Sequence, residues 1–194
     1  MKKFKIIIMF TVIILLCGCG KKDNQLVMVT EAGFAPYEYY ENGEITGVDI
    51  AIAKDIANSM GKELVVKDVA FDSIINEINS GKADFGAAGM SINEERKKSV
   101  DFTIEYTTSK QVVIVKNDSN FTINDLDGKT ISVQLGSVGD SYATKNYSNS
   151  NIIRQKKYLS AIEDVKNNKA DCLIVDELPA EEFIKENSNL KILD

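Results

Sequence analysis

Short apolar runs alternate with amphipathic stretches along the first half of the chain. Three runs have the length and composition of β-strands: Leu26–Thr30, Leu64–Val69 and Ala83–Ala87. Between the first two, apolar residues recur at helical spacing: Val48, Ile52, Ile56 and Met60. A shorter helix is predicted between the second and third runs, with one apolar face: Ile74, Ile75 and Ile78. This strand–helix–strand–helix–strand order predicts a small parallel sheet flanked by helices.

Polar residues and glycines mark the expected ends of these two helices. Asp49 is the expected N-cap of the first helix, and Gly61 is its expected C-cap. Asp72 is the expected N-cap of the second helix, which we expect to end at Gly81.

The same order of elements returns after residue 110. Strands are predicted for four runs: Gln111–Val115, Thr130–Gln134, Asn151–Gln155 and Cys172–Val175. Helices are predicted over Asp140–Tyr147 and from the capping box Ser160–Glu163 to about Asn168. The chain therefore predicts two similar α/β lobes. In open α/β sheets ligands bind beyond the carboxyl ends of the strands, so a cleft is expected where the two lobes face each other.

The N-terminus has the layout of a bacterial export signal. Three lysines precede Ile6–Leu16, an apolar run that is too short to span a bilayer comfortably. The Leu-Cys-Gly-Cys sequence that follows resembles a lipoprotein box, which predicts cleavage before Cys19 and a lipid on its sulfur. We expect a signal peptide over residues 1–18, a lipidated tether over 19–25 and a mature chain anchored to the cell membrane outside the cytoplasm. An uncleaved anchor helix is the alternative.

Composition excludes several classes of function. The chain has no histidine, which excludes histidine-based triads, metal sites and acid–base chemistry, and we expect no metal or cofactor. Its 29 acidic and 23 basic residues give a net charge of −6, which disfavours nucleic acid as a partner. Cys172 lies in an apolar run and is expected to be a small buried residue. With Cys19 lipidated, no disulfide within the chain is expected.

The segment after the third strand is the most informative for chemistry. A small-residue turn at Gly89 is followed by Ser91 and, five residues later, by Arg96. Ser91 and Glu94 fit a capping box, so we expect a helix to begin there with its free N–H groups near Arg96. N–H groups, a hydroxyl and a planar cation together suit a carboxylate. The alternative is an ordinary strand-to-helix connection with a solvated arginine.

Further candidates follow the other predicted strands of both halves. They are Glu31, Phe34 and Phe71 in the first half, and Gly136, Ser137 and Asp176 in the second. Together with Arg96 they provide a cation, acidic side chains and two aromatic rings. Such a set fits a zwitterion flanked by apolar surface, and an α-amino acid is the commonest small molecule of that description.

Six short segments carry a resemblance to a known family. They are Phe34–Tyr37, Gly47–Ile50, Phe71–Ile75, Gly81–Arg96, Val133–Ser137 and Asp176–Glu177. In this order and spacing they resemble the polar amino-acid family (family 3) of extracellular solute-binding proteins of ABC importers, from Leu26 to about Asp194. The resemblance implies a two-lobed, type II periplasmic-binding-protein-like α/β fold with a small mixed sheet in each lobe. The first lobe would span 26–108 and the second 109–194, with a hinge near Thr107–Gln111.

The resemblance also implies a role for the residues around the ligand side chain. Phe34 and Phe71 would pack on its two sides, with plain core packing as the alternative for each. Glu31 would touch the ligand side chain, or would remain a solvated loop acid. Glu31 and the acidic balance favour a basic amino acid such as arginine or lysine, whereas the two phenylalanines would also suit glutamine or a sulfur-containing amino acid.

The ligand's α-carboxylate and ammonium would be held by five other residues. The resemblance implies that Arg96 clamps the carboxylate in a bidentate pair, assisted by Ser91. Ser137 would make a second contact to the carboxylate, or would be a simple N-cap. The carbonyl of Gly89 and the side chain of Asp176 would accept from the ammonium, with a surface acid as the alternative for Asp176.

The implied function is that of a substrate-binding lipoprotein of an ABC importer. It would capture a free amino acid, polar or basic, close its two lobes around it and deliver it unchanged to the membrane permease, acting as a monomer. Two alternatives stay open: an enzyme on the same fold, such as a cyclohexadienyl dehydratase, and an extracellular sensory ligand-binding domain.

The chain departs from the family pattern at its C-terminal end. Members usually continue for several dozen residues beyond the position of Leu190–Asp194 and return to the first lobe. The resemblance therefore implies a C-terminally shortened chain, with apolar surface left uncovered on a first lobe that lacks its usual C-terminal part. We expect residues 20–194 to show a broad, weakly cooperative thermal transition.

Overall fold

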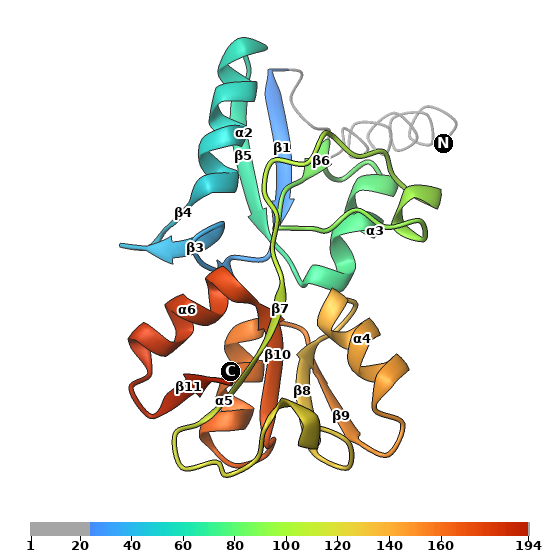
Figure 1. Cartoon of the computed structure of the whole chain (residues 1–194). Helices are drawn as coiled ribbons and strands as arrows, with labels where there is room; N and C mark the ends of the chain where they lie inside the picture. The colour runs from blue at the N-terminus through green and yellow to red at the C-terminus, as the bar shows by residue number, and fades with distance from the viewer. Residues whose placement is uncertain (1–23, 194) are drawn as a thin grey trace, which may run out of the picture.

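Two α/β lobes make up the structure, a computed structural model that describes residues 24–193 (Figure 1). The first lobe contains the strands and helices from β1 (Gln25–Thr30) to residue 98, and the second contains those from β7 (Gln111–Lys116) to residue 193. Residues 101–110 contain no helix or strand and run from one lobe to the other; they are called the crossing segment below. This arrangement agrees with the predicted two-lobed α/β fold.

The first lobe is built on a three-stranded sheet with β1 at its centre. β1 pairs in parallel with β5 (Glu63–Asp68) and with β6 (Phe85–Gly86). Its other elements are the strands β2 (Gly33–Phe34), β3 (Glu38–Glu41) and β4 (Glu44–Thr46), the helices α2 (Val48–Ser59) and α3 (Ile74–Asn79), and the 3₁₀ turns η2 (Phe71–Ser73) and η3 (Arg96–Lys98). β2, β3 and β4 form a separate antiparallel ribbon.

Alternation of side chains along β1 gives the first lobe a core on each face of its sheet. Val27 and Val29 point toward α3 and pack with Ile74, whereas Met28 points toward α2 and packs with Ile50. Each of these clusters is small, because each is closed by one helix only.

The second lobe has a larger, five-stranded sheet in the order β11-β7-β10-β8-β9. β7 is antiparallel to β10 and β11, whereas β8 is parallel to β9 and β10. The elements after β7 are η4 (Ile123–Asp125), β8 (Thr130–Gln134), α4 (Val138–Asn146), β9 (Asn151–Gln155), α5 (Tyr158–Lys166), β10 (Cys172–Asp176), α6 (Glu177–Glu186) and β11 (Leu190–Ile192). The short strands β2 to β4, helix α6 and strand β11 were not predicted.

Both faces of this larger sheet are covered. Leu173 and Val175 of β10 pack under α5 and α6, and Ile174 packs on the other face toward α4. Cys172 is fully buried, as predicted, and burial raises the pKa of its thiol to about 12. Phe34 of the first lobe belongs to the cluster under α5, so the two lobes share apolar contacts.

The ends and the exposed face of α2 differ from the prediction. Its N-cap is Gly47 rather than Asp49. Gly47 has φ 124°, and a Cβ there would lie 2.2 Å from the Tyr37 carbonyl oxygen, so this position requires glycine. Asp49 lies in the first turn and is buried. The C-cap is Met60, directly followed by Gly61 at φ 63°.

The apolar residues at helical spacing on α2 lie on its exposed side. Val48, Ile52, Ile56 and Met60 are 45%, 39%, 40% and 53% exposed, and are called the α2 stripe below. The face toward the sheet is instead formed by Ile50, Ala53 and Ala57. An uncovered apolar surface on the first lobe was predicted, and the α2 stripe is one.

Three predicted helix starts are also wrong. Ser91 and Glu94 form no capping box: residues 91–93 are irregular, and only the short 3₁₀ turn η3 follows. Asp72 lies within η2 and makes no capping hydrogen bond. α5 begins two residues before Ser160, with Lys157 as its N-cap. In each case the tertiary packing of the neighbouring residues overrides a short local motif.

The predictions for the signal peptide, Cys19 and the tether fall on or next to residues 1–23, which lie outside the described part of the chain. Among residues 24–193, no helix is long and apolar enough to cross a membrane.

Candidate functional site

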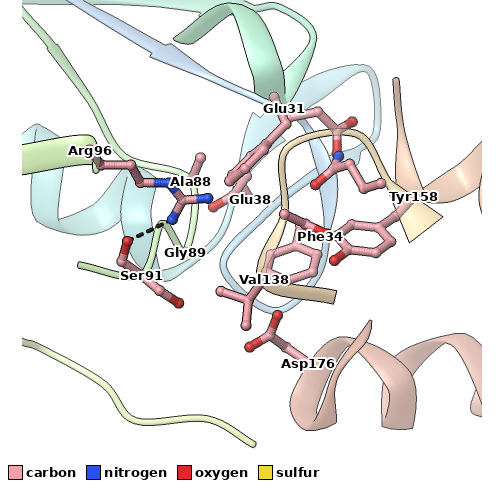
Figure 2. A pocket seen from close by; sticks show the side chains of 13 residues that line it. Glu31, Phe34, Glu38, Ala88, Gly89, Ser91, Arg96, Val138, Tyr158 and Asp176 are labelled. Carbon is pink, nitrogen blue, oxygen red and sulfur yellow. Dashed lines mark hydrogen bonds between the residues drawn. The ribbon is translucent and has the colours of Figure 1, made fainter. Parts of the chain in front are cut away.

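A narrow cavity lies between the two lobes, and the roughly 320 Å³ of space around it includes open solvent at its mouth. All eight residues predicted for ligand binding line it: Glu31, Phe34, Phe71, Gly89, Ser91, Arg96, Ser137 and Asp176. Figure 2 shows how most of them converge from both lobes. Five further lining residues were not predicted: Glu38, Ala88, Gln134, Val138 and Tyr158.

The turn after β6 brings the backbone of the first lobe to the cavity. Gly89 has φ 54°, which favours glycine, and a Cβ on it would lie 2.9 Å from Cε1 of Phe34. Its N–H donates to Oδ2 of Asp49 over 3.0 Å. This buried carboxylate therefore fixes the turn, while Gly89 keeps its carbonyl available beside the cavity.

Arg96 is held over the cavity by contacts to both lobes. The Asn93 side chain, rather than Ser91, accepts from the Arg96 N–H over 2.8 Å and orders the turn. The Arg96 guanidinium lies over the Phe71 ring, 5.4 Å from the centroid. Nη1 donates to the Ser91 carbonyl over 2.6 Å, the dashed line in Figure 2, and Nη2 donates to the Gly136 carbonyl over 2.8 Å. Because a guanidinium carries five N–H groups, these two bonds leave donors for an anion.

Glu31 is a buried acid at the carboxyl end of β1. It is 1% exposed, and its Oε2 accepts from Nε2 of Gln134 in the second lobe over 3.0 Å. Oε1 has no donor among the described residues; Nζ of Lys157 lies 3.9 Å away and bonds Asp68 over 2.6 Å instead. Burial raises the pKa of Glu31 to about 7. The predicted alternative of a solvated loop acid is therefore wrong.

Glu38 is a second buried acid of the cavity. It lies on β3, directly opposite Phe34 of β2, and is 0% exposed. Burial and the nearby charge of Asp49 raise its pKa well above the ordinary value. The local sequence gave no signal for this position, because the antiparallel ribbon that aims Glu38 inward was not predicted.

The second lobe supplies the opposite wall of the cavity. Ser137 is the N-cap of α4, and its hydroxyl accepts from the Asp140 N–H over 3.1 Å, so the predicted capping alternative is present. Asp176 is the N-cap residue of α6 and is half-buried rather than a free surface acid. Figure 2 shows its carboxylate directed toward Val138.

A pair of stacked rings joins the two lobes beside the cavity. The rings of Phe34 and Tyr158 lie 5.0 Å apart at 14°. Tyr158 is 2% exposed. It was missed because α5 was expected to start after it. Gln134 could have been found, because it ends a correctly predicted parallel strand.

The cavity thus places a guanidinium on one side and carboxyl groups on the other, between aromatic rings. A guanidinium binds a carboxylate, and buried carboxylates bind an ammonium or a guanidinium. The arrangement suits a small molecule with both charges.

Residues 26–191 match the family described as bacterial extracellular solute-binding proteins, family 3. The chain belongs to this family. This solute-binding protein is 32% identical to the arginine-binding extracellular protein ArtP of Bacillus subtilis over 91% of this chain and 73% of ArtP. It is 35% identical to a probable histidine-binding protein of Campylobacter jejuni over 98% of this chain and 80% of the relative.

Solved structures of amino-acid-binding proteins superpose on the fold of this chain. The arginine-bound form of a truncated arginine-binding protein from T. maritima superposes with a TM-score of 0.84 at 38% identity, covering 87% of this chain and 81% of the other. The substrate-binding protein of an amino-acid ABC transporter gives a TM-score of 0.84 at 39% identity, covering 88% and 78%. The two-lobed α/β fold is therefore that of amino-acid-binding proteins, and the named relatives are binding proteins rather than enzymes.

Proposed function

We propose that this solute-binding protein captures a cationic amino acid between its lobes, with L-arginine as the first candidate. The observation that carries the proposal is the cavity itself, which is lined by both Arg96 and the buried acid Glu31, and one oxygen of Glu31 forms no hydrogen bond among the described residues. A ligand with a carboxylate at one end and a cation at the other would satisfy both groups. The names of the arginine- and histidine-binding relatives support the same class of ligand.

The proposed pose assigns the α-carboxylate of the ligand to the first lobe. The remaining N–H groups of Arg96 and the Ser91 hydroxyl would bind it, with Ser137 reaching it from α4. The ammonium would donate to the Gly89 carbonyl and to Asp176. All of these residues line the cavity.

The side chain of the ligand would lie among the aromatic residues. Phe34 and Phe71 would flank its apolar part, and its terminal cation would reach Glu31 at the carboxyl end of β1. Because Phe34 also stacks on Tyr158, this ligand position requires a shift of the rings when the lobes move.

Entry of the ligand would need the lobes to separate. Contacts across the cavity join Arg96 to Gly136, Glu31 to Gln134 and Phe34 to Tyr158. We propose that the crossing segment is the hinge, near Thr107–Gln111, and that the ligand favours the closed arrangement. An ABC permease would then recognise that arrangement and receive the amino acid unchanged.

Anchoring forms a separate part of the proposal. The lipoprotein-like sequence before Cys19 supports cleavage at that residue and attachment to the cell membrane by a lipid. Replacing Cys19 by Ser is expected to abolish incorporation of labelled palmitate into the chain. Unchanged incorporation in Cys19→Ser, or none in wild type, would contradict lipidation at this residue.

Titration calorimetry with L-arginine, L-lysine, L-histidine, L-glutamine and L-cystine tests the proposed ligand class. We expect saturable binding, tightest for a cationic amino acid. Arg96→Ala should weaken it at least ~100-fold, because a charge-assisted bidentate contact is lost. Lys97→Ala is the matched control: Lys97 is the next residue, is exposed and, within residues 24–193, pairs only with Glu94, so affinity should not change. A preference for L-glutamine or L-cystine, or equal losses in both variants, would contradict the proposal.

A further inference from the structure

Two buried carboxyl groups meet beneath the cavity. Glu38 on β3 is 0% exposed and Asp49 in the first turn of α2 is 1% exposed. The Asp49 N–H donates over 3.0 Å to the carbonyl of Tyr37, the residue before Glu38. Neither oxygen of Glu38 nor Oδ1 of Asp49 forms a hydrogen bond among the described residues, and a proton on one of the two groups would let it donate to the other.

The other oxygen of Asp49 connects two functional parts of the molecule. Oδ2 accepts from the Gly89 N–H over 3.0 Å and from the Tyr106 hydroxyl over 2.9 Å. Gly89 belongs to the turn that lines the cavity, and Tyr106 belongs to the crossing segment. The position of the Asp49 side chain therefore affects both the ligand site and the connection between the lobes.

The groups that face Glu38 are acidic or phenolic. They are Asp49 from α2, Glu31 from the end of β1 and Tyr106 from the crossing segment. No described lysine or arginine nitrogen lies within 4 Å of either carboxyl group. Across the cavity, Arg96 bonds two backbone carbonyls and Lys157 bonds Asp68. Two neighbouring buried carboxylates with no cation beside them would repel each other strongly, which favours a single negative charge on the pair.

We propose that Glu38 is a neutral carboxylic acid at physiological pH, and that it donates its proton to Asp49 and thereby positions the Gly89 turn and the crossing segment. Oδ1 of Asp49 is the acceptor, and the pair carries one negative charge. Glu38 is in this view a positioning residue, acting on the ligand site through Asp49. The effect of Glu38 on ligand capture rests on the proposed function, whereas the protonation of Glu38 can be tested without any ligand.

The direction of the pH dependence follows from the proton count. Burial, followed by the charge of Asp49, raises the pKa of Glu38 above its ordinary value of 4.5. The folded state therefore holds a proton that the unfolded state releases above about pH 4.5. The resulting stabilisation is fully present below that pH and is lost progressively as the pH rises toward the raised pKa. A glutamine at this position would donate to Asp49 at every pH.

The test measures urea unfolding of the purified chain, without ligand, from about pH 5 to pH 9 for wild type, Glu38→Gln, Glu38→Ala and Glu41→Gln. The ratio of the unfolding constants of wild type and Glu38→Gln should grow with pH, by up to about tenfold per unit, since one proton is involved. Glu41 lies on the same strand but is exposed, so Glu41→Gln should follow wild type. Glu38→Ala should be less stable than Glu38→Gln at every pH, because it lacks the donor.

Parallel curves for wild type and Glu38→Gln would overturn the proposal, and so would a Glu38→Gln variant that is less stable than wild type throughout. Should Glu38→Gln fail to fold, carbon-13 NMR of the glutamate carboxyls in wild type decides. One buried carboxyl, absent from spectra of Glu38→Ala, should stay protonated at pH 7; its ionisation at that pH would contradict the proposal. Because neither readout uses an amino acid, failure of this inference is distinct from failure of the proposed function.

Discussion

The two lobes differ in how well they are packed and in how many ionisable side chains they contribute to the cavity. The second lobe has a five-stranded sheet with apolar clusters on both faces, whereas the first has three strands, small clusters and the exposed α2 stripe. Yet most of the ionisable side chains in the cavity come from the first lobe: Glu31, Glu38 and Arg96, against Asp176 from the second. We therefore expect the better-packed lobe to contribute most of the stability and, under the proposed function, the less covered lobe to contribute most of the ligand contacts.

Substitutions in the two lobes and in the α2 stripe should therefore differ in their effects. A core substitution in the second lobe should lower the free energy of unfolding, with an indirect effect on binding. A cavity substitution in the first lobe should act on binding directly. A substitution in the α2 stripe should do neither, because those side chains are not enclosed by the described part of the chain.

The largest expected effect is in the core of the second lobe. Leu173 is 0% exposed and packs in the cluster under α5 and α6, so Leu173→Ala should lower the free energy of unfolding by ~3 kcal/mol through lost burial and the resulting cavity. Urea unfolding measures the change. A loss below ~1 kcal/mol would mean that the second lobe does not provide the main stability.

A smaller stability effect, joined to a binding effect, is expected at Gly89. Its φ of 54° and the approach of Phe34 make Gly89→Ala cost ~2 kcal/mol and displace the turn that lines the cavity. Gly61→Ala is the matched control, since Gly61 has φ 63° but open space around it. Gly61→Ala should lose only ~1 kcal/mol of stability and should keep its affinity for L-arginine. Equal affinities for both variants would contradict the role of the turn.

The next effect concerns the pH dependence of binding at Glu31. Its pKa of about 7 means that the free protein holds a proton there in mild acid, and a bound cation would expel it. Affinity for L-arginine should therefore rise between about pH 5 and pH 7, by up to ~1.4 kcal/mol per unit. Calorimetry at several pH values should show this rise in wild type and a flat, weaker profile in Glu31→Gln. The same slope in both proteins would show that another group titrates.

The smallest effect is expected on the α2 stripe. Ile56 is 40% exposed, and alanine has the higher helix propensity, so Ile56→Ala should change the free energy of unfolding by less than ~0.5 kcal/mol. The measurement is the same urea titration used for Leu173→Ala. A loss comparable to that of Leu173→Ala would show that the stripe is enclosed in solution and would remove the contrast between the lobes.

Much of the strand framework could be predicted from the sequence. β8 and β9 have the predicted bounds. Each contains β-branched residues and is bounded by polar turn residues, which favours a strand. The cavity residues at the ends of parallel strands, including Glu31 and Asp176, were found for the same reason. The carboxyl ends of parallel strands meet at one edge of a sheet, so a strand that is predicted correctly also places the residues that follow it.

The remaining features depend on contacts between distant parts of the chain. Tyr158 stacks on Phe34 across the lobes, and Glu38 is aimed inward by a ribbon of short strands with little hydrophobic pattern. Capping boxes at Ser91 and Ser160 failed because two residues specify a local hydrogen bond but not the packing around it. The buried face of α2 was also predicted wrongly, because helical spacing identifies an apolar face but does not say what covers it.

Hydrogen exchange with and without saturating L-arginine shows whether the ligand binds between the lobes. We expect slower amide exchange in two separate regions: the turn from Gly86 to Lys98 in the first lobe, and the segments Gln134–Gly139 and Asp176–Glu177 in the second. Protection confined to one lobe, or absent although calorimetry shows binding, would contradict a site closed from both sides.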